Sequence, residues 1–248
     1  MSETKVDATS VDYNYDTFNG SNYSFPQFKT FISAGDRAPD FTGKLLNGDE
    51  ITLSSLAGKK NVVLEFASIS CPPAVNNSAV VKNSINELYS RYKDKGFEFF
   101  LVYVREAHPG EKVSHHKSYD QKVEHATRFK NEEGLQVPII VDSLDGSIHK
   151  KYGMLPNMIY VISKQGLIMY RADWTFVDDL ESVFENLIVA DQRRSAGLHV
   201  RMNFSERLQG LPNPDQSVSD KVLTRAGEKA KQDWDRGHAQ MRARRPPS

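Results

Sequence analysis

The stretch Asn61–Pro73 reads NVVLEFASISCPP and decides the fold. Its first seven residues form a short apolar run behind Gly58-Lys59-Lys60, which predicts a strand buried on both faces of a sheet. The run leads to Cys71, the only cysteine of the chain, and then to two prolines that suit the first turn of a helix. The pattern therefore places a single thiol at the turn from a central strand into a helix.

Strands and helices alternate around this stretch. Further strands are predicted at residues 97–104, 137–142, 158–163 and 167–172, and the last two flank a hairpin loop with Gly166. Apolar faces predict one helix after the prolines (Val81, Ile85, Leu88, Tyr92), one that Ser118 caps together with Gln121, and one at residues 180–188. This order predicts an α/β fold, a three-layer sandwich with a mixed central β-sheet flanked by helices.

Two extensions flank the domain predicted at residues 34–190. Residues 1–33 are rich in Asn, Ser, Asp and aromatics and predict an irregular arm packed on the domain. Residues 191–248 form a C-terminal extension in which Leu211–Ser219, with two prolines, is interpreted as a linker. Residues 221–248 carry eight Lys or Arg against three acidic residues, which is typical of a solvated helix with a basic, frayed end. A docking tail for an acidic partner is the alternative.

Composition excludes several classes of protein. Of the 248 residues 39% are hydrophobic and 26% charged, and the formal net charge is zero, so we expect neither a nucleic-acid nor a membrane partner. The polar N-terminus lacks the apolar run of a leader peptide, and no stretch approaches the ~18 apolar residues of a spanning helix. One cysteine excludes an intramolecular disulfide and fits a reducing compartment, so we expect a cytoplasmic protein.

Cys71 has two interpretations. At a strand-to-helix turn, backbone N–H groups and the helix dipole favour an anion, so the thiol pKa is expected below the ~8.5 of a free cysteine. Ser68 and Ser70 offer hydroxyl hydrogen bonds to a thiolate. A buried packing cysteine is the alternative, but such a residue falls more naturally inside an apolar run than between Ser70 and Pro72. We interpret Cys71 as a nucleophile.

The order of several motifs resembles a known family. GDRAPDF at residues 35–41, followed by a small hairpin and Asn61–Pro73, is similar to the opening of redoxins in the thioredoxin-like superfamily. VYVREAH (102–108), HKSYDQKVEHA (116–126) and YGMLPNMIYVI with LIMY (152–170) are similar to the iodothyronine deiodinases. The resemblance implies a thioredoxin-like fold and a thiol-dependent oxidoreductase that removes halogen from an aromatic substrate.

By position, the resemblance implies site residues. Cys71 takes the place of the catalytic selenocysteine, Glu106 and His108 form the EAH pair, His116 is the second histidine, and Tyr103 is a substrate contact. Because a carboxylate fixes the tautomer of a histidine and a histidine delivers a proton near neutral pH, we predict His108 as the proton donor oriented by Glu106. His116 is assigned to substrate contact.

The chain also departs from the deiodinase pattern. Ile69 stands where some deiodinases have a second cysteine, and Ala74 excludes a C-x-x-C pair. Oxidised Cys71 is therefore expected to be resolved by an outside thiol, glutathione or thioredoxin, with no bound cofactor. Where the family has a glycine-rich stretch with an arginine for the hormone carboxylate, this chain reads RADWT, so Arg171 and Trp174 are the candidate substrate contacts.

Three functions remain open. The first is reductive dehalogenation, the second a one-cysteine thiol peroxidase, and the third a non-catalytic binding protein of the redoxin fold. Peroxidatic redoxins carry Ser or Thr three residues before the cysteine, which Ser68 supplies, but Glu65 replaces the proline of their pattern. The expected partners are a small-molecule substrate and a thiol reductant, and a homodimer is compatible with the sequence.

Two further expectations concern a metal ion and a proline. Residues of the types that bind zinc gather in the motifs (Cys71, Glu106, His108, His115, His116), but their spacing matches no metal pattern, and no metal is expected. Thioredoxin-like folds place a cis-proline before the third core strand, opposite the cysteine. Pro156 precedes MIYVI in that order, so a cis peptide is expected there.

Overall fold

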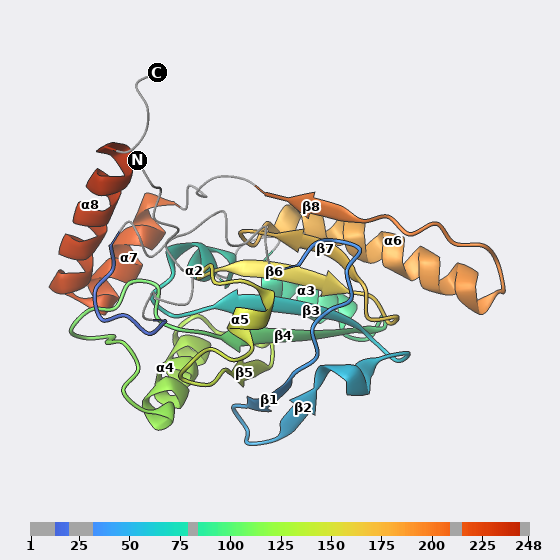
Figure 1. The fold of residues 1–248 in the computed structure, drawn as a ribbon, viewed down its shortest axis with the longest axis horizontal. Helices are drawn as coiled ribbons and strands as arrows, with labels where there is room; N and C mark the ends of the chain where they lie inside the picture. The colour runs from blue at the N-terminus through green and yellow to red at the C-terminus, as the bar shows by residue number, and fades with distance from the viewer. Residues whose placement is uncertain (1–12, 20–31, 79–83, 209–214, 244–248) are drawn as a thin grey trace, which may run out of the picture.

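The computed structural model describes residues 13–19, 32–78, 84–208 and 215–243 (Figure 1). Within them eight strands form one sheet in the order β2-β1-β5-β4-β3-β6-β7-β8. The strands are β1 (Thr42–Leu45), β2 (Glu50–Thr52), β3 (Asn61–Ala67), β4 (Phe97–Tyr103), β5 (Ile139–Val141), β6 (Met158–Ile162), β7 (Ile168–Ala172) and β8 (Ser205–Arg207). The sheet is mixed, because β3 is parallel to β4 and antiparallel to β6.

Helices cover both faces of the sheet, but unequally. They are η1 (Leu53–Leu56), α2 (Pro72–Ser78), α3 (Ile85–Tyr92), α4 (Tyr119–Glu132), α5 (His149–Tyr152), α6 (Val177–Ser195), α7 (Gln216–Ala226) and α8 (Glu228–Ala243). Along β3, Val63 and Ala67 face α2, α3, α4 and α6, whereas Leu64 and Phe66 face the short α5 and η1. The predicted three-layer sandwich with a mixed sheet is confirmed, and most of its helices lie on one face.

β3, the strand that leads to Cys71, lies at the centre of the sheet. All seven residues of β3 are buried, because β4 and β6 flank it and helices cover both faces. The predicted cap of α4 is also present, since the Ser118 hydroxyl accepts the backbone N–H of Gln121 at 3.2 Å. The Gln121 side chain reaches back to the N–H of Lys117 at 2.7 Å and closes the turn before the helix.

The single helix predicted after the prolines is wrong. α2 ends at Ser78, whose hydroxyl donates to Ala74 O at 2.7 Å, and α3 begins separately behind Ser84. The Ser84 hydroxyl accepts the N–H of Glu87 at 3.2 Å, which is an N-cap and fixes a new helix start. Val81, part of the predicted apolar face, lies outside the described residues.

The peptide bond before Pro156 is trans, so the expected cis bond is wrong. A trans X–Pro bond is the more stable form by about 0.5–1 kcal/mol in the absence of other constraints. The next residue, Asn157, holds the segment by donating to Phe66 O at 3.0 Å and accepting the N–H of Thr175 at 2.9 Å.

The C-terminal extension differs from the predicted linker and from the predicted solvated helix. α7 begins at Gln216, inside the predicted linker, where the Asp215 carboxylate accepts the N–H of Ser217 at 2.8 Å. α7 is not solvated on all sides, because Val222 and Leu223 are buried against the core that contains α2. The prediction of a solvated helix considered only the excess of basic residues and did not recognise the apolar face with Val222 and Leu223. Residues 244–248 lie outside the described residues.

The N-terminal arm is described at residues 13–19. Tyr13, Tyr15 and Phe18 are buried against the domain. None of the described helices combines the length and the apolar character needed to cross a bilayer.

Phe184 is predicted to be a main contact between α6 and the sheet. Its fully buried ring lies 5.0 Å from Tyr92, 4.8 Å from Phe97 and 5.7 Å from Phe99, measured between ring centroids. Phe184→Ala should lower the free energy of unfolding by about 3–5 kcal/mol, because it leaves a cavity in a packed core. Urea denaturation followed by circular dichroism measures the change. Val189→Ala, at a half-exposed site on the same helix, should change it by less than about 0.5 kcal/mol. Equal effects of the two changes would contradict this account of the core.

Candidate active site

Cys71 lies at the predicted turn, between the end of β3 and the first residue of α2. Its N–H donates to Ser68 O at 3.1 Å, and its carbonyl accepts the N–H of Val75 at 3.1 Å. The side chain is only 1% exposed and belongs to the core cluster that also contains Val222 and Leu223 of α7. The thiol is therefore in the predicted place, but it is covered.

Burial raises the pKa of the Cys71 thiol to about 12. A hydrogen bond from the backbone N–H of Ala74 lowers the pKa, while the negative charges of Glu65 and Glu106 raise it further. Pro72 and Pro73 carry no N–H, so the start of α2 offers the sulfur few donors. The expected lowering of the thiol pKa is wrong for this conformation, because loss of solvation and two carboxylates outweigh one short helix.

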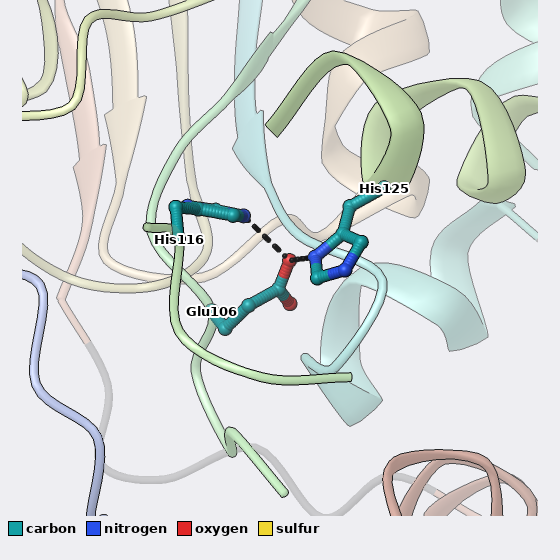
Figure 2. Close-up of side chains that lie close together, drawn as sticks. All are labelled: Glu106, His116 and His125. Atoms are coloured by element: carbon teal, nitrogen blue, oxygen red, sulfur yellow. Dashed lines mark hydrogen bonds and ion pairs between the residues drawn. The ribbon is translucent and has the colours of Figure 1, made fainter. Parts of the chain in front are cut away.

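Glu106 is the centre of the site (Figure 2). Its Oε1 accepts hydrogen bonds from His116 Nε2 at 3.0 Å and His125 Nδ1 at 3.1 Å. The Tyr103 hydroxyl donates to the same oxygen at 2.5 Å. Oε2 accepts the Ser70 hydroxyl at 2.5 Å and the Ser70 N–H at 3.3 Å. The carboxylate of Glu106 thus joins two histidine rings to Ser70, the residue that precedes Cys71.

These hydrogen bonds keep Glu106 ionised. Burial alone would raise its pKa, but the hydrogen bonds from His116 and His125 hold the pKa well below its usual range. An ionised carboxylate only accepts, so each ring must carry a proton on the nitrogen that faces Glu106, and this fixes both tautomers. Burial lowers the pKa of His116 despite the nearby carboxylate, so this ring is a neutral donor at pH 7. The site therefore holds one buried negative charge and several movable protons.

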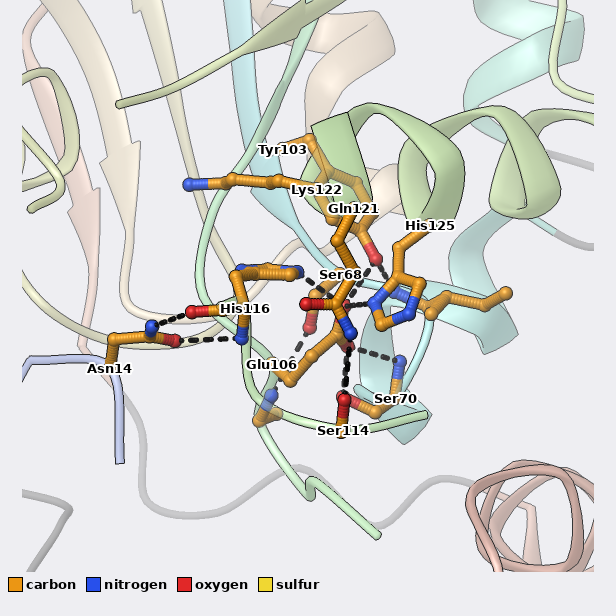
Figure 3. Close-up of polar contacts among 12 residues, drawn as sticks. Asn14, Ser68, Ser70, Tyr103, Glu106, Ser114, His116, Gln121, Lys122 and His125 are labelled. Carbon is orange, nitrogen blue, oxygen red and sulfur yellow. Dashed lines mark hydrogen bonds and ion pairs between the residues drawn. The ribbon is translucent and has the colours of Figure 1, made fainter. Parts of the chain in front are cut away.

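Two neighbouring segments hold His116 in place (Figure 3). The Asn14 side chain, from the N-terminal arm, donates to His116 O at 2.5 Å and accepts its N–H at 3.2 Å. Gln121 on α4 donates to the Ser114 hydroxyl at 2.8 Å and accepts the N–H of Lys117 at 2.7 Å. The loop that carries His116 is pinned on both sides, which suits a ring that must keep one orientation.

His108 lies apart from the histidines on Glu106. Its ring packs edge-on against Phe18 and Trp234, with centroid distances of 4.5 and 4.7 Å. Burial lowers the pKa of His108 to about 3, so the ring is neutral. The rings that Glu106 orients are those of His116 and His125, so the expectation that Glu106 orients His108 is wrong. Alternation along a strand no longer applies there, because β4 ends at Tyr103.

Comparison with known proteins now adds to this geometry. Residues 33–188 match the redoxin family. The chain belongs to the redoxin family. The thioredoxin-like fold expected from the sequence is thereby confirmed. A solved structure, an uncharacterized conserved protein from Geobacillus kaustophilus, is similar over 71% of this chain and 88% of its own, with a TM-score of 0.50 and 16% identity. At that identity it supports the fold alone.

Curated relatives of this redoxin fall into two groups. Type I iodothyronine deiodinase of Xenopus laevis is 26% identical over 124 residues, which are 47% of this chain and 46% of that protein. Thiol-disulfide oxidoreductase ResA of Geobacillus kaustophilus is 32% identical over 161 residues, which are 64% of this chain and 80% of that protein. This redoxin spans about half the length of the deiodinases that it matches.

Sequence reasoning missed two residues of the site. His125 lies inside the quoted motif HKSYDQKVEHA, on the face of α4 that buries Ala126 and Phe129. A histidine among the buried positions of a helix was the available signal. Glu65 lies on β3, 1% exposed, on the same face as Ala67 and Cys71. A carboxylate within an apolar strand was the signal there.

Glu65 is a second buried acid near the thiol. Asn157 Nδ2 donates to its Oε1 at 3.3 Å, while Oε2 has no hydrogen-bond partner in the described part of the chain. Burial raises the pKa of Glu65 to about 7, although hydrogen bonds from Thr175 and Asn157 lower it. This redoxin therefore has one firmly ionised carboxylate, Glu106, and one that titrates near neutral pH, both close enough to raise the pKa of Cys71.

Arg171 on β7 and Trp174 just after β7, the predicted substrate contacts, are each 2% exposed. Arg171 Nε pairs with Glu206 Oε1 on the neighbouring β8 at 2.9 Å, and the guanidinium also bonds to Ile32 O. Arg171 stands opposite Tyr160, whose ring belongs to the core on the other face of the sheet from Cys71. The structure therefore does not bring Arg171 to the thiol.

Glu106, His116 and His125 are also the group best suited to a metal ion among the described residues. One ligand atom from each lies within 4.8 Å of the others, and all three side chains are buried. However, both ring nitrogens donate to the carboxylate, and Tyr103 and Ser70 fill its remaining acceptor sites. A cation would have to displace those protons, so the arrangement fits a proton network better than a metal centre.

Glu65 should make stability depend on pH. Its pKa rises from 4.5 in the unfolded chain to about 7 on folding, so the folded state binds this proton more tightly. The resulting stability is fully present below the unfolded pKa and is lost as pH rises through the folded value. Glu65→Gln should remove that loss. At pH 8 its free energy of unfolding should exceed that of the parent by about 1–3 kcal/mol, and at pH 4.5 it should not exceed it.

Urea denaturation at the two pH values measures the difference. Glu124→Gln, at an exposed site on α4, is the control and should change stability equally at both. A Glu65→Gln effect that is the same at pH 4.5 and pH 8 would show that the carboxyl does not titrate in this range.

Proposed function

We propose that this redoxin is a thiol-dependent reductase that removes iodine, or a comparable halogen, from an aromatic substrate through Cys71. The observation that carries the proposal is the hydrogen-bond chain from Ser70, next to the thiol, through Glu106 to His116 and His125. Reductive dehalogenation adds a proton to the carbon that loses the halogen, so it requires a proton source beside the sulfur. The similarity to deiodinases supports dehalogenation, and the similarity to a thiol-disulfide oxidoreductase supports thiol chemistry in general.

The first step transfers iodine to sulfur. The Cys71 thiol gives its proton to the network on Glu106, and the thiolate attacks the iodine. The sulfur–iodine bond forms as the carbon–iodine bond breaks, and the electron pair of the broken bond stays on the ring carbon. That carbon takes a proton from the network, so the thiol and the aryl iodide become a sulfenyl iodide and the dehalogenated ring.

The return to the thiol requires an outside reductant. One thiol displaces iodide from the sulfenyl iodide and forms a mixed disulfide with Cys71, and a second thiol releases Cys71 as the free thiol together with an external disulfide. No second cysteine exists in these 248 residues, so the intramolecular dithiol exchange of C-x-x-C proteins is not open to this chain. Glutathione or thioredoxin would fill the role.

A second candidate uses the same residues. In a one-cysteine peroxidase the thiolate attacks a peroxide oxygen, becomes a sulfenic acid and releases an alcohol or water that needs the same proton. The single cysteine favours this candidate. Glu65 disfavours it, because Glu65 stands where the pattern of peroxidatic redoxins has a proline. The hydroxyl of that pattern is present in Ser68, which accepts the N–H of Ala107 at 3.3 Å.

Iodide release and peroxide consumption distinguish the candidates. Purified protein with an iodinated phenol and dithiothreitol should release iodide, and Cys71→Ser should release none. Hydrogen peroxide with the same reductant is the parallel assay. Peroxide consumption without iodide release would replace the first proposal by the second. Failure of both assays would leave the non-catalytic binding protein.

His116 should contribute more to turnover than His108. His116→Ala removes a ring that Glu106 orients, so turnover should fall by about 10²-fold, the scale of one acid–base step. His115→Ala, the neighbouring partly exposed histidine, is the matched control and should stay near the parent. Steady-state kinetics that show a larger loss for His108→Ala would restore the role that the sequence had assigned to His108.

A further inference from the structure

Cys71 is covered by the C-terminal extension. α7 packs against α2 at the end of the sheet, and α8 lies beside it (Figure 1). Val222, Leu223 and Ala226 of α7 belong to the same apolar cluster as Cys71. The C-terminal extension thus packs apolar side chains onto α2, the helix that begins directly after Cys71.

The N-terminal arm is joined to this cover. Lys229 of α8 donates to Asp16 O at 2.6 Å and to the Thr17 hydroxyl at 3.2 Å. A side chain at Gly237 of α8 would have its Cβ 2.4 Å from the Phe18 ring, so the helix approaches the arm closely. α7, α8 and residues 13–19 therefore form one unit, which we call the cover.

Arg225 joins α7 of the cover to the domain by three polar contacts. Its Nη1 bonds to Glu132 at 2.9 Å and Glu133 at 2.6 Å, both at the end of α4. Its Nη2 donates at 2.8 Å to Ile69 O, in the turn that leads to Cys71. The side chains of Arg225 and Glu133 are 7% and 2% exposed, so this ion pair is shielded from solvent and salt.

The covered state is closed to chemistry. A thiol that is 1% exposed offers no approach to an iodoaryl ring or to a second thiol. Because burial raises its pKa to about 12, the sulfur is an undissociated thiol at pH 7. Exposure of the sulfur would remove the largest cause of that shift, because burial is what raises the pKa.

We propose that α7, α8 and residues 13–19 form a cover that Arg225 holds shut, and that Cys71 reacts only when this cover opens. The inference rests on the proposed function only in naming Cys71 as the reacting group. Opening separates α7 from α2 and breaks the ion pairs of Arg225. Because Asn14 belongs to the cover, opening also breaks its hydrogen bonds to His116, while the sheet and the hydrogen bonds to Glu106 remain. The cover thereby limits when the thiol is available.

A single cysteine makes the test direct, because alkylation reports on Cys71 alone. Arg225→Met keeps the length of the side chain and removes the guanidinium, and it should speed alkylation by iodoacetamide at pH 8 by about tenfold or more. Arg91→Met is the matched control, since it breaks an ion pair to Glu181 that joins α3 to α6, away from the cover. Its alkylation rate should equal that of the parent.

A second variant and a second measurement guard against simple unfolding. Trp234→Leu loosens α8 at its contact with His108 and should also speed alkylation. If opening is local, the parent rate will change little in low urea, whereas alkylation through global unfolding will rise steeply with urea. A steep urea dependence, or unchanged rates in both variants, would overturn the proposal.

The outcome is separable from that of the proposed function, because alkylation uses no substrate. Faster alkylation in Arg225→Met without iodide release by the parent would keep the cover and reject the dehalogenase. Iodide release by the parent with unchanged alkylation in both variants would keep the dehalogenase and reject the cover.

Discussion

The buried negative charge of Glu106 is the constraint on which the rest of the site depends. An ionised carboxylate away from water is tolerated only when hydrogen bonds replace its hydration, and leaving it uncompensated costs several kcal/mol. The donors come from the turn before Cys71, from β4, from the loop of His116 and from α4. One charge thus holds four separate segments at the same end of the sheet.

The parts of the fold that depend on local pattern were predictable. β3 could be recognised because a strand covered on both faces must be apolar throughout, and α4 because Ser118 and Gln121 cap it. The break between α2 and α3 was not predicted, since Val81 continues the apolar spacing and conceals the cap at Ser84. A pattern of spacing describes a face, but it does not require the backbone to be continuous.

The site shows the same division between local and distant information. The resemblance pointed to Glu106 and His116, which the structure joins by a hydrogen bond, and to Cys71 at the turn, because those residues stand in recognisable motifs. The pairing of Glu106 with His125 rather than His108 depends on how α4 lies on β4, which adjacency in sequence does not reveal. The prediction of a lowered thiol pKa was wrong for a similar reason. The start of α2 is local, but the burial that outweighs it comes partly from α7, about 150 residues further along the chain.

Burial of the thiol also bears on its chemical lifetime. Oxidants carry an exposed thiolate through sulfenic acid to sulfinic and sulfonic acids, and the last stages are not reversed by thiols. Many proteins escape this fate because a neighbouring cysteine traps the sulfenic acid as a disulfide, but Cys71 has no such neighbour in these 248 residues. Enclosure in the apolar core, as an undissociated thiol, shields the sulfur from oxidants, so resistance to oxidation and restricted access arise from the same packing.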